Sequence, residues 1–194
     1  MSENQNNNVK ESVYRLWTPS DKNGNSLYRQ VCPLSADVSP TKWILDSRWD
    51  RSVARDTYPE FRCEWCGPKR LPIGDHPDGA FPGQLFSQRA IEVLGDLLTV
   101  SGDLYKLSIV GCDSPYWLYI CWTKIDALNM EKTIMARDHR VQHAAFKSDA
   151  ILPPAFHVPQ ESGLWVTDAI KNKVEESGVS GFSFQHIGEV AAEW

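Results

Sequence analysis

The clearest hydrophobic periodicity along the chain lies between residues 87 and 100. Apolar side chains recur there at the three- and four-residue spacing of a helix with one buried face: Ala90, Ile91, Leu94, Leu97 and Leu98. Ser87 is a favourable residue for the start of such a helix, and Gly102 is a favourable residue for its end. The pattern therefore predicts a helix from about residue 87 to residue 100.

Two segments rich in β-branched and aromatic residues follow, at 104–110 and 115–122. Residues 111–114, with the sequence GCDS, have the composition of a hairpin turn. In the second segment one face carries Tyr116, Leu118, Ile120 and Trp122, and the other carries Trp117, Tyr119 and Cys121. Because both faces are apolar, we expect this strand to be central and covered on both sides.

The end of the chain repeats the alternation of strand and helix. Residues 164–166 predict a short strand, Thr167 a helix cap, Gly178 the end of that helix, and residues 181–187 a closing strand. Residues 150–158 are interrupted by prolines, so they can form only an extended segment at a sheet edge.

The first part of the chain is less regular. We expect a strand over 13–17 and irregular structure from there to about residue 70, with Trp43, Trp49, Tyr58 and Phe61 adding contact area to the core. Residues 67–83 hold four prolines and four glycines and predict an exposed connecting loop. Residues 1–10 are expected to be a disordered tail, 11–80 an N-terminal lobe, and 81–194 the core of the same domain.

These elements predict an α+β fold with a mixed or antiparallel central sheet, a few packing helices and an irregular N-terminal lobe. The length of 194 residues and the 42% hydrophobic content suit one globular domain. The 25 acidic and 20 basic residues give a net charge of -5, which disfavours nucleic acid as a ligand and favours a basic partner. The polar start of the chain and the absence of an 18-residue apolar stretch favour a cytoplasmic protein without membrane contact.

Five cysteines, an odd number, favour reduced thiols. Cys63 and Cys66 form a CxxCG motif that resembles a zinc knuckle, and Cys32 and His76 could complete four ligands; the alternative is a turn with two reduced cysteines. His139 and His143 have metal-compatible spacing on a helix, although solvated surface histidines are the commoner case. On balance we expect no metal and no cofactor.

We find no catalytic motif: the chain lacks a GxSxG elbow, a GxGxxG loop and a phosphate-binding loop. The 8 Trp and 6 Tyr residues are the types that anchor protein interfaces. The sequence is therefore consistent with a binding protein that is not an enzyme. A small zinc- or cysteine-dependent enzyme and a zinc-stapled adaptor are the alternatives.

Several ordered blocks resemble a bacterial family of immunity proteins, the eleventh family of those that accompany polymorphic toxins. They are FPGQLFSQRAIEVLGDLL at 81–98, YWLYICWTKIDALNMEKT at 116–133, PAFHV at 154–158, GLWVTD at 163–168 and GFSF at 181–184. The resemblance covers about residues 81–190. It implies a non-enzymatic cytoplasmic protein that binds a cognate toxin, delivered by contact-dependent or type VI secretion, and occludes the active site of that toxin.

The candidate partner contacts are polar residues in segments that the sequence predicts to be exposed and irregular. They are Asp75, His76 and Asp78 in the Pro/Gly-rich loop, and Asp113 and Ser114 in the hairpin turn.

Overall fold

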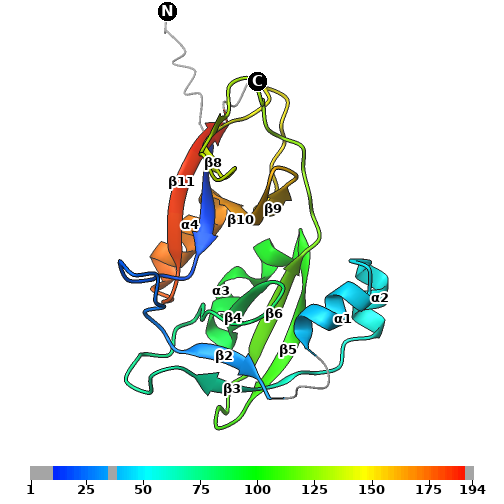
Figure 1. Ribbon diagram of the computed structural model, residues 1–194, viewed down its shortest axis with the longest axis vertical. Coiled ribbons are helices and arrows are strands. Elements are labelled where there is room, and N and C mark those ends of the chain that lie inside the picture. Colours follow the sequence, from blue (N-terminus) through cyan, green and yellow to red (C-terminus); the bar gives the residue numbers. More distant parts are fainter. Residues whose placement is uncertain (1–10, 35–38, 191–194) are drawn as a thin grey trace, which may run out of the picture.

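The computed structural model describes residues 11–34 and 39–190, which form two mixed, curled sheets and four helices (Figure 1). The predicted α+β class is confirmed. The predicted disordered tail, residues 1–10, lies outside the described residues. The described part of the chain contains no helix with the length and apolar character needed to cross a bilayer.

The first sheet has six strands in the order β7-β8-β11-β1-β10-β9. Their bounds are β1 Glu11–Trp17, β7 Ile134–Met135, β8 Val141–Ala145, β9 Ala155–Val158, β10 Glu161–Thr167 and β11 Ser183–Val190. Only β8 and β11 pair in parallel; the other neighbours are antiparallel. As predicted, the proline-flanked segment supplies an edge strand, β9.

The second sheet has five strands in the order β2-β3-β5-β6-β4. Their bounds are β2 Gln30–Pro33, β3 Arg62–Cys66, β4 Gln84–Ser87, β5 Gly102–Ile109 and β6 Tyr116–Cys121. The β5–β6 hairpin and the interior position of β6 are confirmed. Leu118 and Ile120 pack in one hydrophobic cluster, while Tyr119 and Cys121 pack in another, so both faces of β6 are covered.

The helices are α1 Pro40–Asp46, α2 Arg51–Asp56, α3 Gln88–Thr99 and α4 Asp168–Ser177. Both predicted helices are present. The Ser87 hydroxyl accepts a hydrogen bond from the Ala90 amide at the start of α3, and Gly178 ends α4 with a left-handed φ of 65°. Gly102 does not end α3; it begins β5 three residues later.

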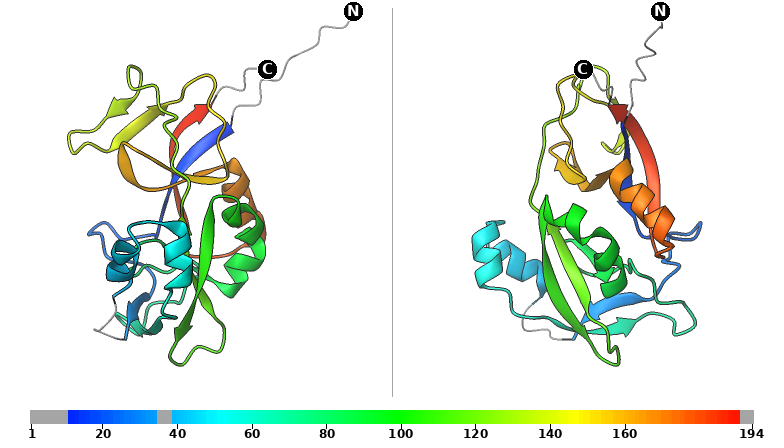
Figure 2. Two further views of the ribbon diagram at one scale, coloured as in Figure 1. Left: turned by 90° about the vertical axis from the view of Figure 1, so that its right-hand side faces the viewer. Right: turned by 180° about the vertical axis from the view of Figure 1, so that it is seen from behind.

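One hydrophobic core joins the two sheets through α3 and α4, which pack against each other (Figure 2). Its buried members include Leu16, Phe86, Leu94, Leu98, Tyr119, Leu164, Val166, Ile170 and Val174. A second cluster lies between the five-stranded sheet and α1 and α2, and a third belongs to the six-stranded sheet. The two sheets therefore share one hydrophobic core.

The N-terminal segment differs from its prediction. Residues 11–80 do not form a lobe of their own, because β1 lies between β10 and β11 while β2 and β3 extend the other sheet. The stretch expected to be irregular contains β2, α1, α2 and β3. Both helices are only six or seven residues long, too short for a periodicity that stands out in the sequence, and they are fixed by the caps Ser39 and Asp50.

Candidate functional site: the cleft between the two sheets

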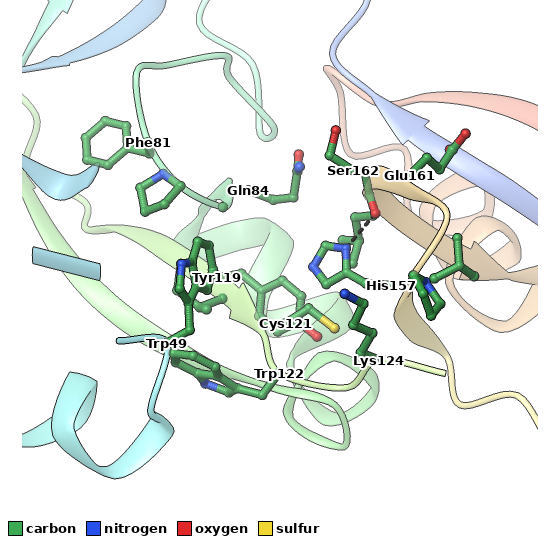
Figure 3. A pocket seen from close by; sticks show the side chains of 17 residues that line it. Trp49, Phe81, Gln84, Tyr119, Cys121, Trp122, Lys124, His157, Glu161 and Ser162 are labelled. Carbon is green, nitrogen blue, oxygen red and sulfur yellow. Dashed lines mark hydrogen bonds between the residues drawn. The ribbon is translucent and has the colours of Figure 1, made fainter. Parts of the chain in front are cut away.

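A cleft of about 750 Å³ opens where β4 and β6 of one sheet face β9 and β10 of the other (Figure 3). We call it the inter-sheet cleft. Aromatic side chains line one side of it: Trp49, Phe81 and Trp122. Polar side chains line the opposite side: Gln84, Lys124, His157 and Ser162. Its size and mixed lining are typical of sites that bind a ligand or an inserted side chain.

Trp49 stands at the rim of the cleft on the short link between α1 and α2. The residue is 52% exposed. Arg48 and Trp49 have left-handed φ values of 53° and 57°, a conformation that costs a non-glycine residue about 1–2 kcal/mol. The Trp49 amide closes the link by donating to the Ile44 carbonyl at 3.3 Å. A large, exposed aromatic side chain is thus presented by a strained turn, a combination that is concentrated at functional sites.

A cluster of charged side chains fixes the orientation of the Trp122 indole. Its indole N–H donates to Asp103 Oδ2 at 2.9 Å, and the same carboxylate receives Arg51 and Arg55 of α2. Burial raises the pKa of Asp103, but the hydrogen bonds from both guanidinium groups and the indole outweigh it and bring this pKa to about 2. The ionised carboxylate ties α2 and the rim of the cleft to β5.

His157 contributes a hydrogen-bond acceptor to the polar side. Its Nδ1 lies 2.6 Å from the carbonyl oxygen of Gly163; since a carbonyl only accepts, Nδ1 carries the proton. Burial lowers the pKa of His157, and the nearby Lys124 lowers it further, so the ring is neutral near pH 7. In Figure 3 the other edge of the ring, with Nε2 as an acceptor, faces the cleft.

The two charged residues of the cleft wall have different surroundings. Glu161 forms a buried ion pair with Arg15 at 2.6 Å and also accepts from the indole of Trp165. The Lys124 ammonium has neither a hydrogen bond nor an ion pair within residues 11–34 and 39–190. Among the described residues that line the cleft, the charge left without an ion pair is therefore the one positive charge of Lys124.

The predicted contacts in the Pro/Gly-rich loop are engaged inside the fold. His76 is 0% exposed and is stacked between Phe86 and Phe182, with its ring nitrogens on Gln84 and the Gly181 carbonyl. The expectation that it is exposed is wrong, because this loop, which joins β3 to β4, packs against the segment just before β11.

The two acids of that loop are half-buried. Asp75 accepts hydrogen bonds from the Ser87 hydroxyl and from the amide of Ser180. Asp78 accepts from the Gln30 side chain. These contacts hold the loop in place and leave little of either carboxylate for a partner.

Asp113 and Ser114 are exposed in the β5–β6 turn, as predicted, but neither lines the cleft. The residues that do were missed for a definite reason. The sequence predicts Trp49 to be a core residue, and nothing in the residues around it signals two consecutive left-handed conformations. The cleft itself arises from contacts between segments more than thirty residues apart, which periodicity does not reveal.

The CxxCG motif is not a zinc knuckle. Cys63 and Cys66 lie on strand β3, where residues three apart point to opposite faces and cannot share a metal. Cys66 forms a disulfide with Cys32 across the β2–β3 pair, so the expectation of reduced thiols is wrong for these two. His139 lies in a turn and His143 on β8, so the helical spacing that would bring them together does not exist.

The two buried free thiols, Cys63 and Cys121, are poor nucleophiles. Burial raises the pKa of Cys63 to about 12 and also raises the pKa of Cys121. Within the described residues, no three His, Cys, Asp or Glu side chains gather in a way that could hold a metal ion.

A comparison with protein-family models and with curated proteins found no match for the chain.

Proposed function

We propose that the protein is an immunity protein, which binds a cognate secreted bacterial toxin and neutralises it by occluding the active site. The ordered sequence blocks at 81–184 support the family, and the observation that carries a binding role is Trp49. Exposed tryptophans in fixed positions are the strongest anchors of protein interfaces. The strain at Arg48 and Trp49 is a cost that a purely structural turn would avoid by using glycine.

The partner surface in this proposal is the rim of the inter-sheet cleft around Trp49, in place of the loop around Asp75, His76 and Asp78. A toxin segment that covers Trp49 would bury an aromatic side chain which is now half in solvent. Arg51 and Arg55 lie on α2, which begins two residues after Trp49, and they are already paired with Asp103, so their alignment costs little further side-chain entropy on binding.

The overall charge supports attraction of a basic toxin. The exposed surfaces of α3 and α4 carry acidic side chains, Glu92, Asp96 and Glu176, in addition to Glu175, which is paired with Lys171. Together with the net charge of -5, they favour the approach of a positively charged domain and speed its association at low salt. These acids act at long range and are not themselves the proposed contact.

We also propose that the protein is not an enzyme. The alternatives relied on Cys63, Cys66 and a zinc ion. The disulfide at Cys66 and the burial of Cys63 remove the chemistry that those alternatives required.

The compartment is a separate proposal. The sequence favours the cytoplasm, whereas a Cys32–Cys66 disulfide is typical of an oxidising compartment. Alkylation of thiols in denaturant, immediately upon cell lysis, distinguishes the two, because denaturation also exposes the buried Cys63 and Cys121. Five modified cysteines support the cytoplasm, and three support an oxidising compartment.

The experiment that tests the function is protection in cells. The chain is expressed together with the toxin encoded by the neighbouring gene, and growth is compared with that of cells expressing the toxin alone. We expect restored growth and a stoichiometric complex on purification. Continued toxicity at equal toxin levels, with the chain soluble and folded, would overturn the proposal.

A further inference from the structure

The inter-sheet cleft has the dimensions of a small-molecule site. Its volume of about 750 Å³ falls within the range of roughly 300–1,000 Å³ that such sites occupy. It has an aromatic side and a polar side that face each other across the opening (Figure 3). A ligand that fits both must combine a flat apolar body with a polar group at one end.

The charge of the polar side selects the sign of that group. The Lys124 ammonium has no partner in the described ranges, whereas Glu161 is neutralised by Arg15. A cationic ligand would be repelled by Lys124. A doubly charged phosphate would leave one negative charge uncompensated, since one lysine balances only one charge. A single carboxylate matches the charge available.

The other side chains specify the body of the ligand. The indoles of Trp49 and Trp122 offer faces against which a planar ring can stack, and Trp122 is fixed by its hydrogen bond to Asp103. His157 has its Nδ1 proton on Gly163, so its Nε2 can accept from an N–H or O–H group on the ligand.

We infer that the inter-sheet cleft binds a small aromatic monocarboxylate, with the carboxylate at Lys124 and the ring against Trp49 and Trp122. An N–H or O–H on the ring or its substituent donates to His157. The inference does not depend on the proposed function, because it concerns this chain alone and is tested without a toxin.

The test uses indole-3-propionate as the probe and indole-3-propionamide as its neutral counterpart. Both are titrated into the purified full chain and followed by calorimetry and by ligand-observed NMR. We expect saturable binding of the acid at one site and binding of the amide weaker by about tenfold, the size of one charge-assisted hydrogen bond.

Three variants locate the site. Lys124→Met should weaken binding of the acid by about tenfold and leave that of the amide unchanged, since the lysine recognises only the charge. Trp49→Ala should weaken both ligands. Lys132→Met, which alters an exposed lysine outside the cleft, should change neither. Each variant is first shown to be folded by circular dichroism.

Two results would overturn the inference. One is an absence of saturable acid binding to the wild-type chain up to about 10 mM, weaker than any affinity that discriminates a ligand. The other is acid binding that Lys124→Met and Lys132→Met change equally, which would place the carboxylate elsewhere.

Discussion

Asp103 connects α2, β5 and Trp122 through one carboxylate. Replacing it by Asn removes the charge and keeps the size, so Arg51 and Arg55 lose their counterion. Both arginines are about half exposed, so solvent screening reduces the loss. We expect Asp103→Asn to lower the free energy of unfolding by about 1–2 kcal/mol at pH 7, measured by urea denaturation.

The pH dependence of that loss follows from the pKa of Asp103, which folding lowers from 3.8 to about 2. The stabilisation is complete above the unfolded value and disappears as the pH falls through 3.8 towards 2. The difference between wild type and Asp103→Asn should therefore shrink at pH 3. Asp126→Asn, at the exposed pair with Lys147, is the control and should leave stability nearly unchanged, because solvent screens this pair. Equal losses in the free energy of unfolding for Asp103→Asn and Asp126→Asn would contradict the stabilising role assigned to Asp103.

His76 predicts a pH dependence near neutrality. Burial between two phenylalanine rings lowers its pKa in the folded state, so the unfolded chain binds the proton more readily. Stability should fall as the pH drops below about 6.5, the ordinary value for histidine. His157 contributes with the same sign. In urea unfolding between about pH 7.5 and pH 5.5, we expect His76→Gln to show a smaller decrease than wild type; an unchanged slope would exclude His76 as a source.

At the level of elements, long regular segments were predictable from sequence and short ones were not. The sequence predicts α3 and β6 because the apolar residues of each follow a single periodicity, that of a helix in α3 and that of a strand in β6. Each periodicity extends over enough positions to exclude the alternative element. α1, α2 and β3 are too short for that, and they owe their stability to Trp43 and Phe61 in the core and to the Cys32–Cys66 disulfide. The same shortness concealed the candidate site, since Trp49 belongs to the link between two such helices.

The disulfide joins Cys32 to Cys66, which are 34 positions apart in the sequence. It therefore closes a loop of the chain that contains α1, α2 and Trp49. Loop-closure entropy for that length corresponds to about 4 kcal/mol of stability. We expect the double variant Cys32→Ser, Cys66→Ser to lose about 3–4 kcal/mol in guanidinium unfolding, and dithiothreitol to destabilise the wild type but not this double variant. Cys112→Ser, at a free half-exposed thiol, is the matched control. An unchanged stability of the wild type in dithiothreitol would contradict the Cys32–Cys66 disulfide.

For the whole molecule, the core that joins the sheets predicts one cooperative unfolding transition. Leu107 is buried in the cluster of the five-stranded sheet and is not a member of the cluster of the six-stranded sheet. Leu107→Ala should lower global stability by about 2–5 kcal/mol and speed amide exchange in β1 and β10 as much as in β5. Faster exchange confined to the five-stranded sheet would show two independent units.

The most direct test of the account is the affinity of the purified chain for the toxin domain encoded beside it, measured by calorimetry with two tryptophan variants. Trp49→Ala removes the proposed anchor, and Trp17→Ala removes a tryptophan of similar exposure outside the cleft. We predict nanomolar binding for the wild type and Trp17→Ala, and a loss of at least about thirtyfold for Trp49→Ala. The absence of binding by the wild type, or equal affinities for all three proteins, would contradict the account.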